Sequence, residues 1–409
     1  QLLTLRSGGP KVGKDLADLG IIEGGATAAK DGKICWVGLS QDAGFSSQRV
    51  LDACGKVVMP GFVDPHTHLV FAGSREDEFE QRLKGVSYRE IAEAGGGIRS
   101  TVRATRKASR EELFDLAKRR LDVMLSWGTT TAEAKSGYGL NYTDELKLLE
   151  VIRSLSGQHT VDLVPTFLGA HEVPDEYRER REAYIDLLTD ELIPEVAKRG
   201  LARFCDVFCE EGVFDPVESR TILWRGQEFG LKAKIHADEL SPSGGAEVAG
   251  EVGAISAAHL NYPSERGLAT MRDARTVAVL LPGASLFLKE NDLPPVRRMV
   301  ELGLPVALAT DFNPGSSPVY GMPVVLSLSC LLFGLTPAEA VSAATLNAAY
   351  AIDLGERVGS IEVGKDADLL ILNVESYKEI PYWFGHNPVE LVIKRGEIIK
   401  TSARTENRE

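Results

Sequence analysis

The sequence predicts an α/β fold: a (β/α)₈ TIM barrel flanked by a composite β domain formed by the N- and C-terminal segments. Three observations lead to this prediction. The middle of the chain alternates short apolar runs with longer amphipathic, charge-rich stretches, which is the order of repeated βα units. Eight such units fit into about 290 residues, the number and size typical of a barrel. Both ends of the chain carry short β-like runs instead.

The eight predicted strands are short runs separated by stretches long enough for a crossover helix. In chain order they cover residues 62–64, 129–132, 161–165, 205–208, 231–235, 254–258, 277–280 and 306–309. Helices are predicted between them, for example over residues 110–127 and 145–154. An open doubly wound sheet is the alternative, but the Gly-x-Gly-x-x-Gly turn typical of such sheets does not follow the first strand.

Both ends of the chain differ from the middle in the same way. Short β-like runs lie between Gly- and Asp-rich turns before about residue 58, and similar runs return after about residue 355. These runs cover residues 34–37, 56–59, 358–361, 368–372 and 390–394. Because two separated segments share this pattern, we predict one discontinuous β domain made of residues 1–58 and 358–409. The barrel is predicted over residues 59–357.

The composition is that of a folded, acidic protein. The chain has 409 residues, of which 46 are Lys or Arg and 59 are Asp or Glu, for a formal net charge of −13. A hydrophobic fraction of 44% with 26% charged residues is typical of globular proteins. The acidic balance argues against nucleic acid or an anionic membrane as a partner, since both require a basic face. We therefore expect a small-molecule partner.

Other features of the sequence concern the cellular setting. No apolar run approaches the roughly 18 residues that span a bilayer, and no basic-then-apolar leader is visible. Because the chain opens at Gln1 rather than at Met, a native leader can already have been trimmed, and the native N-terminus stays open. The five cysteines are scattered and odd in number, which favours reduced thiols in a cytoplasm over a disulfide framework.

Ligand-type side chains follow several predicted strands at their carboxyl ends, the face of a barrel where active sites are built. The first strand leads into His66-x-His68, and residues two apart share a face, so both imidazoles can point into the barrel mouth. The fifth strand leads into His236, the sixth into His259 and the eighth into Asp311. Both histidines of the first strand, with His236 and Asp311, form the predicted ligand set. It suits one Zn²⁺ or one iron ion, Fe²⁺ or Fe³⁺, and does not distinguish between them.

Several motifs resemble those of a known family. Residues 60–68 are similar to the first-strand signature of the amidohydrolase superfamily, and residues 344–349 with 359–369 resemble its closing segment. Within the superfamily, five further motifs look like those of the imidazolonepropionases, which open 4-imidazolone-5-propanoate to N-formimidoyl-L-glutamate in histidine degradation. These motifs cover residues 71–75, 95–98, 135–139, 168–174 and 310–316. The resemblance implies a metal-dependent hydrolase barrel beside a composite β-sandwich, and no motif before about residue 30 contributes to it.

Opening such a ring requires a nucleophilic water, a group that stabilises oxyanion charge, and a proton for the leaving nitrogen. A bound divalent metal supplies the first by lowering the pKa of water towards about 7. Glu239 is predicted to shuttle the proton, Asp311 to ligate the metal and accept a proton, and His259 to stabilise the oxyanion. Lys135 follows the second strand and no lysine follows the fourth, so nothing resembles a carbamylated lysine between two metals. One metal per chain is expected.

The substrate that the resemblance implies carries a carboxylate, whereas a chain of net charge −13 repels anions at long range. A local cation is therefore required, and Arg75 has a planar fork suited to a carboxylate. In the family the neighbouring loops hold the ligand as well. The further candidates for substrate binding are Tyr88, Tyr138, His171, Glu239, Asn313, Gly315 and Ser316. Which of Arg75, Tyr138 and His171 dominates carboxylate binding stays open.

Two other functions remain as alternatives. A deaminase of the same superfamily, acting on a cytosine- or guanine-like ring, also uses His-x-x-Glu after the fifth strand. It would release ammonia, whereas ring opening of an imidazolone does not. A catalytically silent barrel serving as a scaffold would hold less than one metal per chain. The resemblance favours the hydrolase and suggests a cytoplasmic homodimer, although the residues themselves do not define the oligomeric state.

Overall fold

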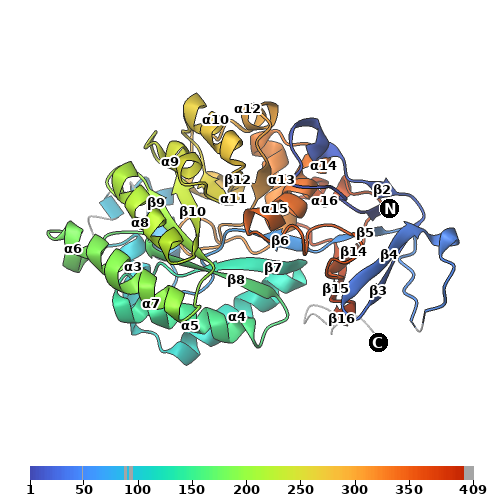
Figure 1. The fold of residues 1–409 in the computed structure, drawn as a ribbon, viewed down its shortest axis with the longest axis horizontal. Helices are drawn as coiled ribbons and strands as arrows, with labels where there is room; N and C mark the ends of the chain where they lie inside the picture. The colour runs from blue at the N-terminus through green and yellow to red at the C-terminus, as the bar shows by residue number, and fades with distance from the viewer. Residues whose placement is uncertain (48, 87–89, 92–94, 400–409) are drawn as a thin grey trace.

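An eight-stranded parallel sheet is the centre of the fold. The computed structural model describes residues 1–47, 49–86, 90–91 and 95–399. The strands of the sheet are β6 Phe62–Asp64, β7 Thr129–Lys135, β8 Asp162–Ala170, β9 Phe204–Cys209, β10 Lys232–Ala237, β11 Ser256–His259, β12 Val277–Leu280 and β13 Val306–Leu308. They are hydrogen-bonded in chain order, each parallel to the next. Helices surround this sheet (Figure 1), as expected of repeated βα units.

The sheet closes beyond the ends of its first and last strands. The amide of Asp311 donates to the carbonyl of His66 at 3.1 Å, and the amide of His68 donates to the carbonyl of Phe312 at 2.9 Å. These bonds join the segment after β6 to the segment after β13 at the carboxyl ends of the strands. The predicted barrel is confirmed, and three of the predicted metal ligands lie on the seam that closes it.

All eight predicted strands are present, with shifts at their ends. β12 coincides with the prediction for residues 277–280, whereas β7 extends beyond the predicted 129–132 toward the barrel mouth. The extension contains Glu133 and Lys135, polar residues that a search for apolar runs leaves out. Both side chains are fully buried, because they pair with each other and with further charged groups inside the barrel.

Five of the described helices, α4, α5, α8, α10 and α14, begin at a side-chain cap. At the start of α4 Arg110–Ser126, the side chain of Ser109 accepts a hydrogen bond from the amide of Glu112. The side chain of Glu112 in turn accepts one from the amide of Ser109. The helices predicted over 110–127 and 145–154 are confirmed. The other helices are α1 Glu76–Leu83, α3 Ile98–Lys107, α5 Tyr142–Ser156, α6 Arg181–Asp186, α7 Ile193–Lys198, α8 Pro216–Glu228, α9 Gly245–Glu251, α10 Glu265–Ala274, α11 Pro282–Leu288, α12 Val296–Glu301, α13 Met322–Phe333, α14 Pro337–Ala343, α15 Leu346–Ala351 and α16 Glu379–Tyr382. Within the described part of the chain, none is long and apolar enough to span a bilayer.

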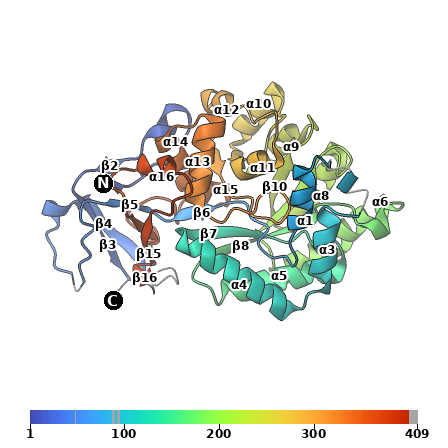
Figure 2. The same cartoon turned by 180° about the vertical axis from the view of Figure 1, so that it is seen from behind.

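The two ends of the chain build a second sheet beside the barrel. Its strands are β1 Leu2–Leu3, β2 Ile21–Ile22, β5 Val57–Pro60, β14 Leu369–Leu372, β15 Val389–Lys394 and β16 Glu397–Ile399, and they pair in the order β16-β15-β14-β5-β1-β2. A hairpin of β3 Gly25–Lys30 and β4 Lys33–Leu39 packs on this sheet, because Ile34 shares a small core with Leu2 and Leu369. Figures 1 and 2 show the N-terminal and C-terminal strands side by side at one end of the molecule. The β-rich unit from both termini is therefore present, and its proposed boundaries at 58 and 358 stay a prediction.

One predicted strand is wrong. Residues 358–361 form turns instead. Gly359 has a φ of +89°, and a Cβ there would lie 2.9 Å from the Cα of Leu346 at the start of α15. This left-handed conformation against a helix is one that glycine tolerates and a regular strand excludes. Val358 and Ile361 are buried in two different cores, so the apolar run indicates burial rather than a strand.

Candidate active site

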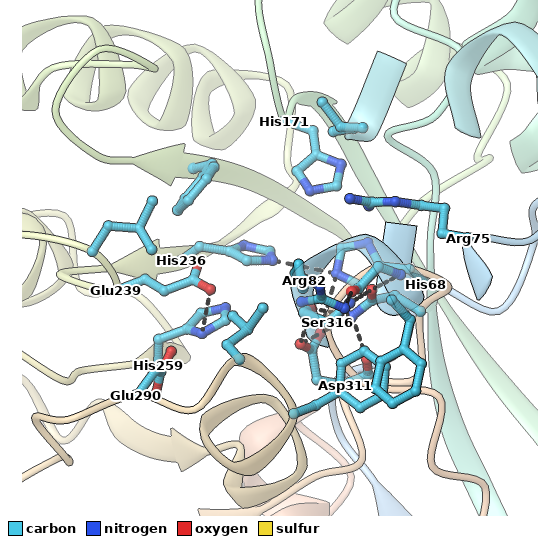
Figure 3. Close-up of a pocket in the computed structure, with 18 of the residues that line it drawn as sticks. His68, Arg75, Arg82, His171, His236, Glu239, His259, Glu290, Asp311 and Ser316 are labelled. Atoms are coloured by element: carbon cyan, nitrogen blue, oxygen red, sulfur yellow. Dashed lines mark hydrogen bonds and ion pairs between the residues drawn. The ribbon is translucent and has the colours of Figure 1, made fainter. Parts of the chain in front are cut away.

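A cavity of about 510 Å³ opens at the carboxyl ends of the barrel strands. In Figure 3 its side chains converge from several elements on a common centre. The predicted residues that line it are His68, Arg75, Tyr138, His171, His236, Glu239, His259, Asp311, Asn313, Gly315 and Ser316. His66 contacts Asp311 just outside this lining, and Tyr88 lies outside the described residues. The fold thus gathers the described candidates in one place.

The four predicted metal ligands converge at one point of the cavity. Nε2 of His66 lies 3.4 Å from Oδ1 of Asp311, and Nε2 of His68 lies 3.6 Å from the same oxygen. Nε2 of His236 lies 3.4 Å from Nε2 of His68. His259 approaches as well, since its ligand atom and those of His66 and His236 lie within 4.8 Å of one another. These positions make a shared metal geometrically reasonable, and the assignment of each ligand stays a prediction.

The electrostatics of these groups fit a metal ion. Burial lowers the pKa of His66, His68 and His259 well below the ordinary value, which favours the neutral form that binds metals. Nε2 of His66 is buried and has no hydrogen-bond partner among the described residues. Burial also raises the pKa of Asp311 well above its ordinary value. A divalent cation would satisfy the orphaned nitrogen and stabilise the carboxylate at the same time.

Glu239 follows β10 and faces His259 in the cavity. Its Oε1 lies 3.4 Å from Nδ1 of His259, as the dashed line in Figure 3 shows. Burial raises the pKa of Glu239 well above its ordinary value, and the nearby carboxyl groups of Asp311, Glu290 and Glu210 raise it further. A carboxyl group whose pKa is raised holds its proton to a higher pH than an ordinary glutamate and is suited to deliver that proton to a leaving group.

The loop after β13 forms one wall of the cavity. Nδ2 of Asn313 donates to the carbonyl of Asp311 at 2.7 Å and to Oγ of Ser316 at 2.8 Å. Its Oδ1 accepts from the amides of Gly315 and Ser316, both at 2.8 Å. These bonds hold the backbone at Asp311 and the following turn in one arrangement. Asn313 therefore has a visible role inside its own loop, and its predicted contact with substrate stays a prediction.

Arg75 reaches the same loop from the segment after β6. A Cβ at Gly315 would collide with its guanidinium, so a glycine at this position lets the arginine lie against the loop. Nε of Arg75 donates to Oε2 of Glu78 at 2.8 Å, which orients the guanidinium fork. In Figure 3 this fork points across the cavity toward His171. Arg75 is thus placed as a cation that a bound anion can reach.

Tyr138 and His171 lie beside the predicted metal ligands. The His171 ring stacks on His68 with centroids 5.0 Å apart, and its Nδ1 lies 2.9 Å from the carbonyl of Gly137. Burial lowers the pKa of His171 to about 3, so the ring is neutral. A neutral ring that donates from Nδ1 to a carbonyl keeps Nε2 as an acceptor. His171 is therefore suited to accept a hydrogen bond, and poorly suited to bind a carboxylate.

Four charged residues that line the cavity are absent from the sequence-based candidates: Arg82, Glu172, Lys289 and Glu290. Arg82 donates from Nη2 to the carbonyl of Gly315 at 3.2 Å, and Figure 3 shows it within the same group of side chains. It lies on α1 seven residues after Arg75, so helical spacing could have revealed it. Glu290 lies just after α11 and approaches Glu239. No sequence pattern indicates Glu290, because its place depends on how α11 packs over the barrel.

Comparisons with known proteins agree with this arrangement. Residues 217–399 match the Amidohydrolase family. Imidazolonepropionase of Symbiobacterium thermophilum is 52% identical over 414 residues, covering 100% of this chain and 97% of that protein. Imidazolonepropionase of Geobacillus kaustophilus is also 52% identical, over 98% of this chain and 96% of that protein.

Solved structures with a similar fold are more distant in sequence. 5-Methylcytosine deaminase from Klebsiella pneumoniae is 18% identical, with a TM-score of 0.73 over 94% of this chain and 95% of that chain. Guanine deaminase of E. coli is 17% identical, with a TM-score of 0.69 over 92% of both chains. At such identities the likeness concerns the fold alone, so these deaminases do not favour deamination for this chain.

Proposed function

Because this chain belongs to the imidazolonepropionase family, we propose that it hydrolyses a ring C–N bond of 4-imidazolone-5-propanoate to give N-formimidoyl-L-glutamate. The reaction is a step of histidine degradation and is carried out by a hydrolase of cyclic amides. One observation carries the proposal beyond family membership. A single cavity holds a cluster of buried imidazoles, a carboxyl group whose pKa is raised, and an arginine fork.

The proposed metal ligands are His66, His68, His236 and Asp311. When bound there, one zinc or iron ion would provide a water of lowered pKa and a Lewis acid for the carbonyl group of the ring. One ion rather than two is proposed, because Lys135 is not available for carbamylation. Its ammonium lies 2.8 Å from Oε2 of Glu133 and is held as a cation by buried carboxylates, whereas carbamylation requires a neutral amine.

Glu239 is proposed to move the proton that the reaction requires. The oxygen of the attacking water forms a bond to the ring carbonyl carbon, and the C–N bond of the ring breaks. Glu239 gives its own proton to the departing nitrogen and takes one from the attacking water, so that it ends protonated as it began and no other acid is consumed. His259, next to Glu239, stabilises the negative charge that develops on the oxygen, and Asp311 assists as a proton acceptor.

Arg75 is proposed to bind the propanoate carboxylate. The guanidinium fork is oriented by Glu78 and rests against the loop at Gly315, so its geometry is set before the substrate arrives. The acceptor character of Nε2 of His171 favours Arg75 over His171 for this contact. Further contacts from Tyr88, Tyr138, His171, Asn313, Gly315 and Ser316 are proposed from the family resemblance. We also propose a cytoplasmic homodimer.

The test is turnover of imidazolonepropanoate by the purified chain, with assays for ammonia and metal. We expect formation of N-formimidoylglutamate without ammonia, together with about one equivalent of zinc or iron per chain by elemental analysis. Release of ammonia from a cytosine- or guanine-like ring would favour the deaminase instead. A chain with neither turnover nor a full equivalent of metal would contradict the enzyme and favour a scaffold.

A further inference from the structure

A continuous chain of buried charges lies inside the barrel next to the predicted metal ligands. Nζ of Lys135 lies 2.5 Å from Oδ2 of Asp206 and 2.8 Å from Oε2 of Glu133. Nζ of Lys234 lies 2.7 Å from Oε1 of Glu133. The other carboxylate oxygen of Asp206, Oδ1, lies 3.1 Å from Nδ1 of His236. All four charged side chains are at most 2% exposed, and two cations balance two anions.

His236 differs from the other two predicted histidine ligands in the hydrogen-bond partner of its Nδ1 atom. Nδ1 of His66 and Nδ1 of His68 are buried without a hydrogen-bond partner among the described residues. Only the His236 ring of these three has a carboxylate at its Nδ1 atom within the described part of the chain. An imidazole that donates from Nδ1 to a carboxylate keeps its proton there and leaves Nε2 free to coordinate.

We propose that Asp206 is a positioning residue that holds the His236 ring with Nδ1 protonated and Nε2 directed at His66, His68 and Asp311. The proposal rests on the proposed function insofar as it assumes that a metal binds at this point. Asp206 does not line the cavity, so it reaches the predicted metal site through its contact with His236.

The ion pairs explain why Asp206 can hold this position. The Lys135 ammonium lies 2.5 Å from Oδ2 and pairs with the buried carboxylate of Asp206. A carboxylate paired with an ammonium offers only acceptor atoms, so the His236 ring is the donor in their contact. Lys135 engages Oδ2, which leaves Oδ1 for His236.

The same network of buried charges also holds the backbone just after β6 in place. Nζ of Lys234 donates to the carbonyl of Pro65 at 2.8 Å, immediately before His66. Lys234 and His236 lie two residues apart on β10, so both point into the barrel. One buried network therefore links the backbone that presents the first two histidines to the ring that presents the third.

The first experiment reads the tautomer of His236 directly in metal-free protein. We would label the histidine rings with ¹⁵N, remove metal with a chelator, and record ring ¹H–¹⁵N correlations at pH 8, assigning His236 by comparison with His236→Gln. A proton on Nδ1 of His236 is expected, because the Asp206 acceptor is present without any metal. A bare Nδ1 would overturn the proposal, and this wild-type measurement does not depend on any variant folding.

The second experiment measures zinc affinity by competition with a chelating dye. In Asp206→Asn, Lys135 has donors only and takes the amide oxygen, so the amide NH₂ faces Nδ1 of His236. The ring must then accept at Nδ1 and carry its proton on Nε2, the atom needed for coordination. We expect zinc affinity to fall about 10- to 100-fold, the size typical of lost outer-shell partners.

Glu210→Gln is the matched control for this experiment. Glu210 is a buried carboxylate just after the same strand, β9, but its oxygens accept from the amide of Leu240 and the hydroxyl of Ser241 rather than from a histidine ring. The zinc affinity of Glu210→Gln is expected to stay within about twofold of wild type. An equal loss in both variants, or no loss in Asp206→Asn, would overturn the proposal.

The two experiments also separate this proposal from the proposed function. A wild-type chain that binds no zinc and no iron would contradict the metal-dependent hydrolase. The tautomer of His236 in the same metal-free sample would still decide whether Asp206 positions that ring. Conversely, normal turnover with a bare Nδ1 would overturn the positioning role and leave the hydrolase intact.

Discussion

Both ends of the barrel hold a group of ionisable side chains, but only the group at the mouth is suited to bind a metal ion. At the mouth, His66, His68 and Asp311 bring ligand atoms within 4.8 Å of one another. At the opposite end, near the start of β8, Asp162, Asp366 and Asp368 do the same. By proximity alone, both groups are candidate metal sites.

The partners of these groups distinguish them. Asp162 accepts from Arg357 at 3.0 Å and from Arg395 at 2.6 Å, and Lys394 bridges Asp162 and Asp368 at 3.1 and 2.6 Å. The carboxylates at this end therefore already have cations from the protein. Their location between barrel strand β8 and terminal strands β14 and β15 indicates that they join the barrel to the second sheet.

At the mouth, Asp311 lies beside His66 and His68 instead. Burial lowers the pKa of His66 and His68 well below the ordinary value, and a buried nitrogen of His66 has no hydrogen-bond partner among the described residues. Burying polar atoms without partners costs free energy, which a bound ion can offset. The comparison teaches that unsatisfied ligand atoms, rather than nearby ligand-type residues, identify a site.

The largest expected effect is loss of the metal at the mouth. His236→Ala removes one of the imidazoles that converge there, so we expect the chain to lose its zinc or iron and, with it, all turnover. Elemental analysis of the purified variant is the measurement. His171→Ala is the control, because His171 lies in the same cavity but outside the converging groups, and it should keep the metal.

Two results would change this assignment. Full metal occupancy in His236→Ala would remove β10 from the ligand set. Two equivalents of metal in the wild-type chain would contradict the single-metal site.

The next largest effect is expected at the opposite end, in stability. Lys394→Met leaves Asp368 buried with a lost cation, since their side chains are 5% and 3% exposed. Breaking a buried pair from one side costs about 3–5 kcal/mol. Chemical denaturation should show this loss in the free energy of unfolding, while turnover per folded molecule stays at the wild-type level.

Lys33→Met is the control for this prediction. Lys33 pairs with Asp366 at 2.6 Å in the same group, but its side chain is 50% exposed. Exposed pairs contribute about 0.2–1 kcal/mol, so its loss should be small. A large drop in turnover or in metal content for Lys394→Met would show that this end of the barrel does more than join the two parts.

A third prediction concerns proton transfer. Glu239→Gln keeps the shape of the side chain but cannot carry the proton, so kcat should fall about 10²-fold or more. Metal content and the unfolding midpoint should stay at wild-type values. Steady-state kinetics with imidazolonepropanoate is the measurement, and a kcat within about threefold of wild type would mean that Glu239 only lines the cavity.

The smallest expected effect concerns the carboxylate of the substrate. Arg75→Met removes the fork, and a charge-assisted hydrogen bond contributes roughly 1.5–3 kcal/mol, so KM should rise at least about tenfold. Arg75→Lys should recover part of the affinity, since a point charge lacks the two-pronged geometry. An analogue without the carboxylate should bind wild type and Arg75→Met almost equally. Equal weakening of both ligands would instead indicate that Arg75 shapes the loop at Gly315.

Much of the barrel and of its mouth followed from local patterns. Strand runs and helix caps depend on residues close in the chain, and polar residues at strand ends reach the mouth in any parallel barrel. His66, His68, His236 and Asp311 could therefore be grouped before any contact was known. The strand predicted at residues 358–361 was wrong because its conformation does not depend on neighbouring residues. Distant segments bury its apolar side chains, and a left-handed glycine interrupts the backbone.

Which charges meet inside the barrel was decided by the tertiary structure. Lys135 and Asp206 are 71 residues apart, and Asp206 and His236 are 30 apart, so no local spacing joins them. Their contacts depend on strand register and on closure of the sheet, which bring inward-facing side chains of β7, β9 and β10 to the same level. Residue types at strand ends are readable from sequence because alternation is local, whereas the pairing of buried charges depends on the geometry of the whole barrel.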